Sequence, residues 1–165
     1  MLKKLQKFIV KNKLSISLYI GLILIYFFIH LFALTRLPVF ADESIYIRWA
    51  QLIIDDWKRY LFFSMNDGKT PLFIWLLVPF QYIFKDQLFA GRFLAVLVGL
   101  IQVFVNMDVV KCLGGKKSTQ LLMGIFTIVL PFWYFHHQMA LMDGLLALLI
   151  SISYLFLVKV FNSKK

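Results

Sequence analysis

Carboxylates stand beside an apolar run near the start of this sequence. Asp42 and Glu43 are adjacent and follow the first apolar run by a few residues. Paired carboxylates can supply a general base together with a metal or hydrogen-bond ligand. A structural role is the alternative, with Asp42 as the N-cap of a helix that starts at Ser44 and Glu43 favouring the helix dipole. Residue types alone leave both interpretations open.

A single lysine stands in a similar position further along the chain. Lys69 precedes Thr70 and Pro71, where another apolar run begins. A lysine at the level of lipid headgroups can hold a phosphate as a point charge. It can equally be an ordinary interfacial lysine attracted to anionic lipid.

Further titratable residues flank the later apolar runs. Asp143 lies at the start of one, and a carboxylate at the mouth of a membrane helix is a functional candidate by default. His136 and His137 precede it, but adjacent helical positions point about 100° apart, so we expect polar interface residues and no metal site. Arg92 is placed to pair with an outer acid or a phosphate, or to extend its charged end to the interface.

The amino-acid composition indicates the environment in which the chain folds. The chain has 165 residues and is 61% hydrophobic and 16% charged, whereas soluble domains are about 45 to 50% apolar. This excludes an ordinary water-soluble fold and predicts a membrane protein. An aromatic content of 18% excludes a disordered chain. One cysteine, Cys112, excludes an intramolecular disulfide and a cysteine-based metal cage.

Five apolar runs divide the chain, and we expect four of them to span. Leu14–Leu34 is an uncharged run of 21 residues, long enough for a bilayer core, which needs about 20 residues of helix. It exceeds the apolar region of a signal peptide and lacks a cleavage site, so we expect an uncleaved helix. The other runs are Pro71–Phe84, Leu88–Val110, Gln120–Phe135 and Gly144–Phe161. Pro71–Phe84 is short and suits an interfacial or re-entrant segment.

Lysine placement predicts the orientation, because Lys and Arg in short loops are retained on the cytoplasmic side. If Pro71–Phe84 does not span, all three lysine clusters fall on one side. These are Lys3, Lys4, Lys7, Lys11 and Lys13; Lys111, Lys116 and Lys117; and Lys159, Lys164 and Lys165. The net charge of +10 is therefore assigned to orientation in the bilayer, and no nucleic acid is expected as a partner. The N-terminus is predicted to be cytoplasmic, in the plasma membrane.

The first outer loop, residues 36–87, is expected to hold two interfacial helices. Apolar residues recur at helical spacing within Ser44–Tyr60, which predicts an amphipathic helix. They are Ile45, Trp49, Leu52, Ile53, Trp57 and Tyr60. A second helix is expected to start at Pro71 with Thr70 as its cap. The chain, residues 1–165, is thus predicted to be a single all-α membrane domain of about four transmembrane helices.

The order of these features resembles the N-terminal part of the C-type (GT-C) membrane glycosyltransferases that use polyprenyl-phosphate sugars, the protein mannosyltransferase and aminoarabinose transferase group. The matching segments are F-A-D-E-S-I-Y-I-R-W-A, D-G-K-T-P-L-F-I-W-L-L, F-A-G-R-F-L-A, the lysine-rich inner loop and M-A-L-M-D-G-L-L-A. The resemblance covers most of the chain. Each motif is short, so the order and the topology carry the specificity.

The resemblance implies transfer of a hexosyl or pentosyl group from a lipid-phosphate donor at the extracytoplasmic face. Asp42 matches the acid that activates the acceptor, Glu43 its partner and Asp143 the acid of the second outer loop, which makes these three the expected catalytic residues. Lys69 and Arg92 would bind the donor phosphate and stabilise its leaving charge. No cofactor is identified, and a divalent cation is one option.

The length departs from the family pattern, since family members continue with many more spans. We therefore expect an N-terminal module that is incomplete alone and needs a second chain to supply the rest of the enzyme. The alternative is a non-catalytic four-helix membrane scaffold or partner subunit. A transporter subunit is less favoured, because the runs contain few central polar residues apart from His30 and Asn106.

The four-span topology predicts that the loop at Gly114 and Gly115 is cytoplasmic. An accessibility tag inserted between these glycines is expected to react only after the membrane is permeabilised. Labelling from the extracytoplasmic side would overturn the topology.

Overall fold

The described fold consists of helices and their connections. The computed structural model describes residues 2–163, and their side chains from residue 16 onward. The helices are α1 (Leu2–Leu31), α2 (Ala41–Asp55), α3 (Trp57–Tyr60), the 3-10 helix η1 (Phe63–Asp67), α4 (Leu72–Ile83), α5 (Gln87–Cys112), α6 (Lys117–Val129), α7 (Pro131–His136) and α8 (Met142–Ser163). No strand occurs within residues 2–163, which confirms the all-α prediction. The side chains of the N-terminal lysines, and Lys164 and Lys165, lie outside the described residues.

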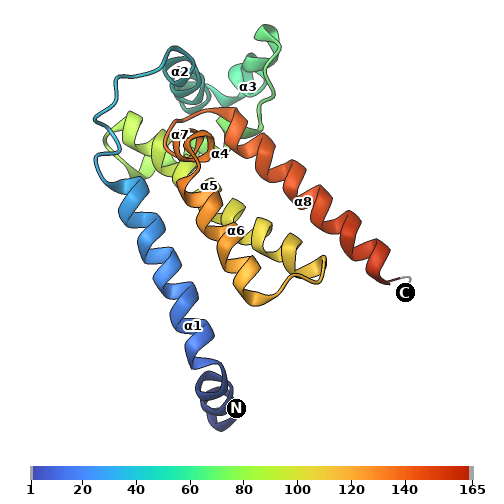
Figure 1. The fold of residues 1–165 in the computed structure, drawn as a ribbon. Helices are drawn as coiled ribbons and strands as arrows, with labels where there is room; N and C mark the ends of the chain where they lie inside the picture. The colour runs from blue at the N-terminus through green and yellow to red at the C-terminus, as the bar shows by residue number, and fades with distance from the viewer. Residues whose placement is uncertain (1, 164–165) are drawn as a thin grey trace.

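Helix α5 is the centre of the arrangement. It packs against α8, α6, α4, α1 and α2. In Figure 1, α2, α3 and α4 gather at the end where α1 finishes and α8 begins, and α1, α6 and α8 extend away from that end. One group of helices thus forms a cap over one end of the others.

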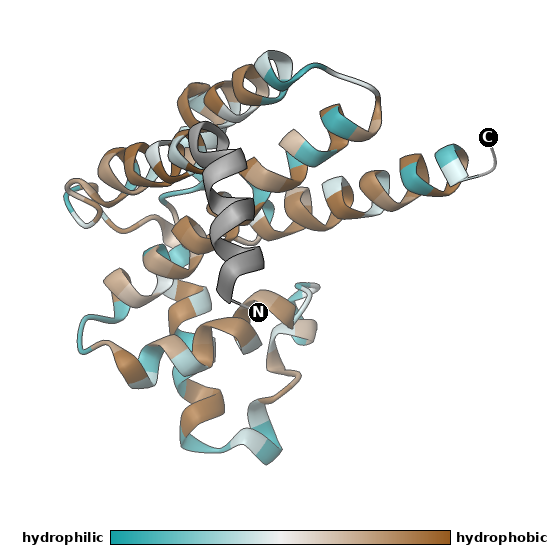
Figure 2. Cartoon of the chain, turned by 90° about the horizontal axis from the view of Figure 1, so that it is seen from below, coloured by the Kyte–Doolittle hydropathy of each residue, from teal (hydrophilic) through white to brown (hydrophobic). Residues whose placement is uncertain are grey.

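Among the described residues, two helices are long and apolar enough to cross a membrane, α5 and α8. The described part of α1, Ile16–Leu31, and helix α4 are apolar but shorter. Hydrophobic residues predominate along the coloured helices, with hydrophilic residues both between them and in several connections (Figure 2). At 12 residues, α4 is shorter than the roughly 20 residues that a crossing helix needs.

The run Gln120–Phe135 does not form the single helix that we expected. It divides into α6, of 13 residues, and α7, of six. Proline lacks an N–H group and disfavours helical geometry in the residue before it. Leu130, before Pro131, accordingly has extended backbone angles of −61° and 131°.

The boundaries and the buried face of α2 also differ from the prediction. The helix begins at Ala41 and ends at Asp55, and Asp56 starts a separate short helix, with its side chain accepting from the Arg59 N–H at 3.3 Å. The buried face of α2 is shifted by about one residue from the apolar face that the sequence predicted. Tyr46, Trp49, Ala50 and Ile53 are buried, whereas Ile45 and Trp57 are exposed. Most of this buried face packs with α4 and α5 in one hydrophobic cluster.

A second cluster joins α1 to α5 and α6. The Tyr26 hydroxyl donates to the Val96 carbonyl at 2.8 Å. This hydrogen bond links α1 to α5 within an otherwise apolar interface. Gly99 of α5 allows this approach, because a Cβ atom there would overlap the His137 ring and the Tyr26 hydroxyl. Gly21 of α1, in contrast, has open space where its Cβ would lie.

Polar side chains connect α5 to α6 and α8 within the apolar body. Gln102 donates to Asn106 at 2.9 Å and to Ser151 at 2.6 Å. Asn106 donates in turn to Thr127 at 3.2 Å. Side-chain hydrogen bonds of this kind hold helices together in lipid, with about 0.6 kcal/mol each on average.

The two glycines provide a matched test of the α1–α5 packing. Gly99→Ala is expected to destabilise the fold by about 1 to 3 kcal/mol, because the added methyl group overpacks the interface. Gly21→Ala makes the same chemical change in open space and is expected to leave stability unchanged or slightly raised. Thermal unfolding in detergent measures both. Equal melting temperatures for the two variants would contradict the packing described here.

Candidate functional site

A hollow of about 500 Å³ lies where α2, the segment before α4 and the start of α8 meet. We refer to it as the polar hollow. Its lining residues are Asp42, Tyr46, Gly68, Lys69, Thr70, Leu72, Phe73, Met142, Asp143, Leu145, Leu146 and Leu149. Three of the five residues predicted for the site, Asp42, Lys69 and Asp143, therefore line one space although they are far apart in sequence.

The two carboxylates of the polar hollow occupy equivalent positions on their helices. Asp42 lies in the first turn of α2 and Asp143 in the first turn of α8. A negative charge is favoured there by the helix dipole. Asp42 is not the N-cap, since Phe40 takes that position. Among the described side chains, neither carboxylate forms an ion pair, so both oxygens of each are available to a ligand.

A left-handed residue places Lys69 beside these acids. Gly68 caps the 3-10 helix η1 with a φ of +68°, and the Lys69 N–H donates to the Ser64 carbonyl at 3.1 Å. Glycine adopts this conformation without a steric penalty. The next residue, Thr70, contacts the Met142 sulfur at 3.7 Å across the hollow rather than capping α4. Helix α4 begins after Pro71, at Leu72.

Tyr46 is a further residue of the site that was not predicted. It lies one helical turn after Asp42, on the same face of α2, and is 3% exposed. Burial raises the pKa of Tyr46, the charge of Asp42 raises it further, and Lys69 opposes both. The hydroxyl therefore stays protonated at neutral pH and can donate a hydrogen bond. Its spacing of four residues from Asp42 was the available signal.

Glu43 does not accompany Asp42 into the hollow. Its carboxylate is paired with Arg92, with Nε to Oε1 at 2.9 Å and Nη2 to Oε2 at 2.8 Å, and both side chains are 0% exposed. This is a buried bidentate pair. The acidic pair in the sequence is thus divided between two functions, one residue facing the hollow and one facing the interior.

The remaining donors of Arg92 are also occupied. Its Nη1 donates to the carbonyls of Leu34 at 2.8 Å and Leu37 at 3.0 Å, and Nη2 donates to that of Pro38 at 3.0 Å. With the two bonds to Glu43, all five N–H donors of the guanidinium are used. Arg92 pairs with an acid, which was one of its expected alternatives, and has no donor left for a phosphate.

The carboxylate of Glu43 is saturated in the same way. Oε2 accepts from the Phe40 N–H at 2.9 Å, and Oε1 accepts from the Ala140 N–H at 2.8 Å. Burial acts to raise its pKa, but the hydrogen bonds from Arg92 and the two amides outweigh this, so the pKa of Glu43 lies below its ordinary value. The geometry does not support a catalytic role for Glu43 or a substrate-binding role for Arg92.

The two histidines have different surroundings: His136 is partly exposed, whereas His137 is 1% exposed and lies against Gly99 in the interior, so the expectation of two polar interface residues is wrong for His137. The His136 Nδ1 lies 2.8 Å from the Phe132 carbonyl, and the His137 ring lies 5.6 Å from that of His30. Within the described residues, no group of three or more His, Cys, Asp or Glu side chains could hold a metal ion. Carboxylates available to a cation in the polar hollow are Asp42 and Asp143.

The chain matches no protein-family model, no curated protein and no solved structure. The chemistry of the polar hollow is therefore the basis for a functional assignment.

Removal of one partner of the buried pair is expected to be costly. Arg92→Leu leaves an uncompensated carboxylate in the interior and should destabilise the fold by about 3 to 5 kcal/mol. Replacing both partners, as Glu43→Leu with Arg92→Leu, should be less damaging than the single change. Thermal unfolding in detergent at neutral pH measures this. A melting temperature for Arg92→Leu equal to that of the wild type would contradict the assignment.

The same pair predicts a pH dependence of stability. The folded-state pKa of Glu43 is lowered, so its contribution is fully present above the ordinary value of 4.5 and is lost as the pH falls through the folded-state value. The stability advantage of the wild type over the double variant should therefore narrow on acidification. A stability difference that narrows as the pH rises would contradict the lowered pKa of Glu43.

Proposed function

We propose that the chain is a membrane module of a glycosyltransferase that takes its sugar from a polyprenyl-phosphate donor. The observation that carries the proposal is the convergence of Asp42, Lys69 and Asp143 on one hollow from three separate segments. Two carboxylates can activate and orient a hydroxyl, and an ammonium can hold a phosphate. Sugar transfer from such a donor needs a group that accepts the proton of the acceptor hydroxyl and a group that binds the phosphate.

The membrane placement is part of the proposal. Helices α5 and α8 cross, and α1 and the unit of α6 with α7 supply the other two of four spans. Figure 1 supports this, since the cap of α2, α3 and α4 lies at the opposite end of α5 from the turn between α5 and α6. Lys111, Lys116 and Lys117 lie in that turn or directly beside it. The positive-inside rule then puts the turn in the cytoplasm and the polar hollow at the extracytoplasmic face of the plasma membrane.

The proposed reaction assigns one role to each residue of the hollow. The acceptor hydroxyl attacks the anomeric carbon, its proton passes to the Asp42 carboxylate, and the bond between that carbon and the phosphate oxygen breaks. Polyprenyl phosphate leaves, and Lys69 stabilises its charge. Asp143 orients the acceptor or holds a divalent cation, and the Tyr46 hydroxyl donates to a sugar or phosphate oxygen.

The walls of the hollow support a lipid-linked substrate. Leu145, Leu146 and Leu149 of α8 line one side of it, and Leu146 and Leu149 are exposed. A polar floor next to an apolar wall fits a donor with a charged headgroup and a hydrocarbon tail. A water-soluble nucleotide sugar would gain nothing from that wall. A second chain is the proposed source of the remaining acceptor and donor contacts.

Charge-removing variants separate donor binding from transfer. In vesicles that contain a polyprenyl-phosphate sugar, Lys69→Gln should weaken donor binding about tenfold, because one phosphate contact is lost. With the proposed second chain and an acceptor also present, Asp42→Asn should retain donor binding but lower transfer by about 10²-fold or more. Asp55→Asn, an exposed acid of α2 outside the hollow, is the matched control.

Two results would count against the proposal. Equal donor binding by Lys69→Gln and Asp55→Asn would show that Lys69 does not bind the donor phosphate. Donor binding without any transfer by the unsubstituted chain, even with its partner chain present, would favour a scaffold over a catalyst.

A further inference from the structure

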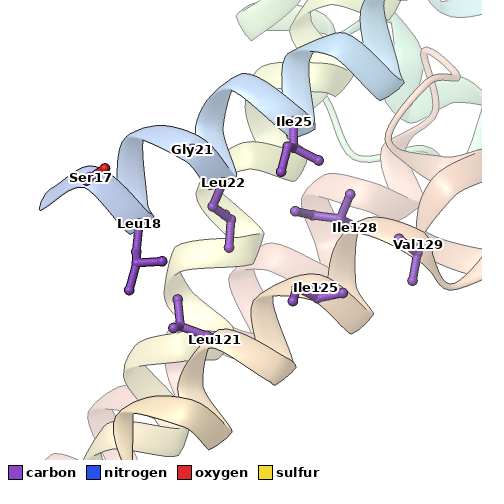
Figure 3. A pocket seen from close by; sticks show the side chains of 9 residues that line it. All are labelled: Ser17, Leu18, Gly21, Leu22, Ile25, Leu121, Ile125, Ile128 and Val129. Atoms are coloured by element: carbon purple, nitrogen blue, oxygen red, sulfur yellow. The ribbon is translucent and has the colours of Figure 1, made fainter. Parts of the chain in front are cut away.

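An apolar groove lies between α1 and α6, away from the polar hollow. It encloses about 270 Å³ and is lined by Ser17, Leu18, Gly21, Leu22, Ile25, Leu121, Ile125, Ile128 and Val129. Figure 3 shows aliphatic side chains of the two helices along the groove, with the hydroxyl of Ser17 at one end. We refer to it as the α1–α6 groove.

The α1–α6 groove follows matching stripes on two helices. Ser17, Gly21 and Ile25 are spaced four residues apart on α1, and Leu121, Ile125 and Val129 have the same spacing on α6. Residues at this spacing share one helix face. Each stripe covers about 12 Å at a rise of about 1.5 Å per residue, close to one leaflet of a hydrocarbon core about 30 Å thick.

One end of the groove is basic. Lys117 lies one turn before Leu121 on the same face of α6, and its Nζ is 5.2 Å from the centre of the Tyr19 ring on α1. This contact holds an exposed ammonium against α1, one helical turn before the groove residue Leu121. Lys116 is adjacent and also exposed. The other end, near Ile25 and Val129, is lined by aliphatic residues.

We propose that the α1–α6 groove binds one acyl chain of an anionic phospholipid, with the lipid phosphate at Lys117. The length of the groove matches one leaflet, and its charge is complementary to such a headgroup. The inference uses the proposed membrane placement, with this end in the inner leaflet, and is independent of sugar transfer.

Gly21 allows the groove to be filled without disturbing the packing. A Cβ atom at Gly21 meets nothing within 4 Å, so Gly21→Leu should occupy the space of the acyl chain. Leu24→Phe adds bulk to an exposed position of the same helix outside the groove and is the matched control. Ile125→Phe fills the groove from α6, should Gly21→Leu fail to fold. Lys117→Gln removes the headgroup contact and leaves the groove open.

Native mass spectrometry after extraction from vesicles tests the proposal. The vesicles contain equal amounts of phosphatidylglycerol and phosphatidylcholine with identical chains. The wild type and Leu24→Phe should each retain about one phosphatidylglycerol, and Gly21→Leu should lose it about tenfold. Lys117→Gln should reduce the preference for phosphatidylglycerol over phosphatidylcholine about fivefold.

Other outcomes would overturn the inference. Equal retention by Gly21→Leu and Leu24→Phe would exclude the groove as the lipid site. Equal retention of the two lipids by the wild type would exclude the role of Lys117. Pairing of two chains that Gly21→Leu abolishes would identify a second copy as the occupant instead. Donor binding at the polar hollow should be unchanged in every variant, so failure here is distinct from failure of the proposed function.

Discussion

The buried pair of Glu43 and Arg92 is the interaction on which the arrangement at this end of the molecule depends. A guanidinium in the interior costs several kcal/mol unless every donor is matched. Arg92 of α5 meets this requirement with the carboxylate of α2 and with carbonyls from residues 34 to 38. Glu43 adds the amide of Ala140, just before α8. Four segments of the chain are therefore fixed relative to one another by a single set of hydrogen bonds.

The positions of the two carboxylates of the polar hollow follow from this pair. Asp42 is the neighbour of Glu43, and Asp143 lies three residues after Ala140, so each carboxylate is held through an adjacent contact of the buried pair. Lys69 reaches the same hollow by another route. Helix α4 is tied to α2 by the Gln81 side-chain amide, which donates to the Ile47 carbonyl at 3.2 Å. The side chains proposed to act on a substrate thus make none of these contacts themselves. Other residues nearby in the sequence make them.

The sequence predicted the long helices well because continuous apolar runs carry a strong local signal. The expected Leu88–Val110 and Gly144–Phe161 are observed as α5 and α8, within a few residues at each end. The break at Pro131 was missed, although a proline within a run is itself a local signal. The face of α2 was displaced because burial of Tyr46 and Ala50 depends on where α4 and α5 pack, which local periodicity does not contain.

The site was predictable in part. Asp42, Lys69 and Asp143 were identified from charge beside apolar runs, and the structure brings them together. The division between Asp42 and Glu43 was not predictable, because it depends on a contact between residues 49 positions apart. The sequence showed that Arg92 had an acid as one possible partner. Only the packing of α2 on α5 determines which acid it meets.

The apolar wall of the polar hollow also bears on how a ligand is supplied. Exposed leucines of α8 line the hollow on one side. In the proposed membrane placement, an amphiphile would therefore approach along the bilayer rather than through water. Its effective concentration is then its mole fraction among the lipids, which is independent of the volume of solution. Dilution of vesicles would leave occupancy unchanged, whereas added lipid or detergent would lower it.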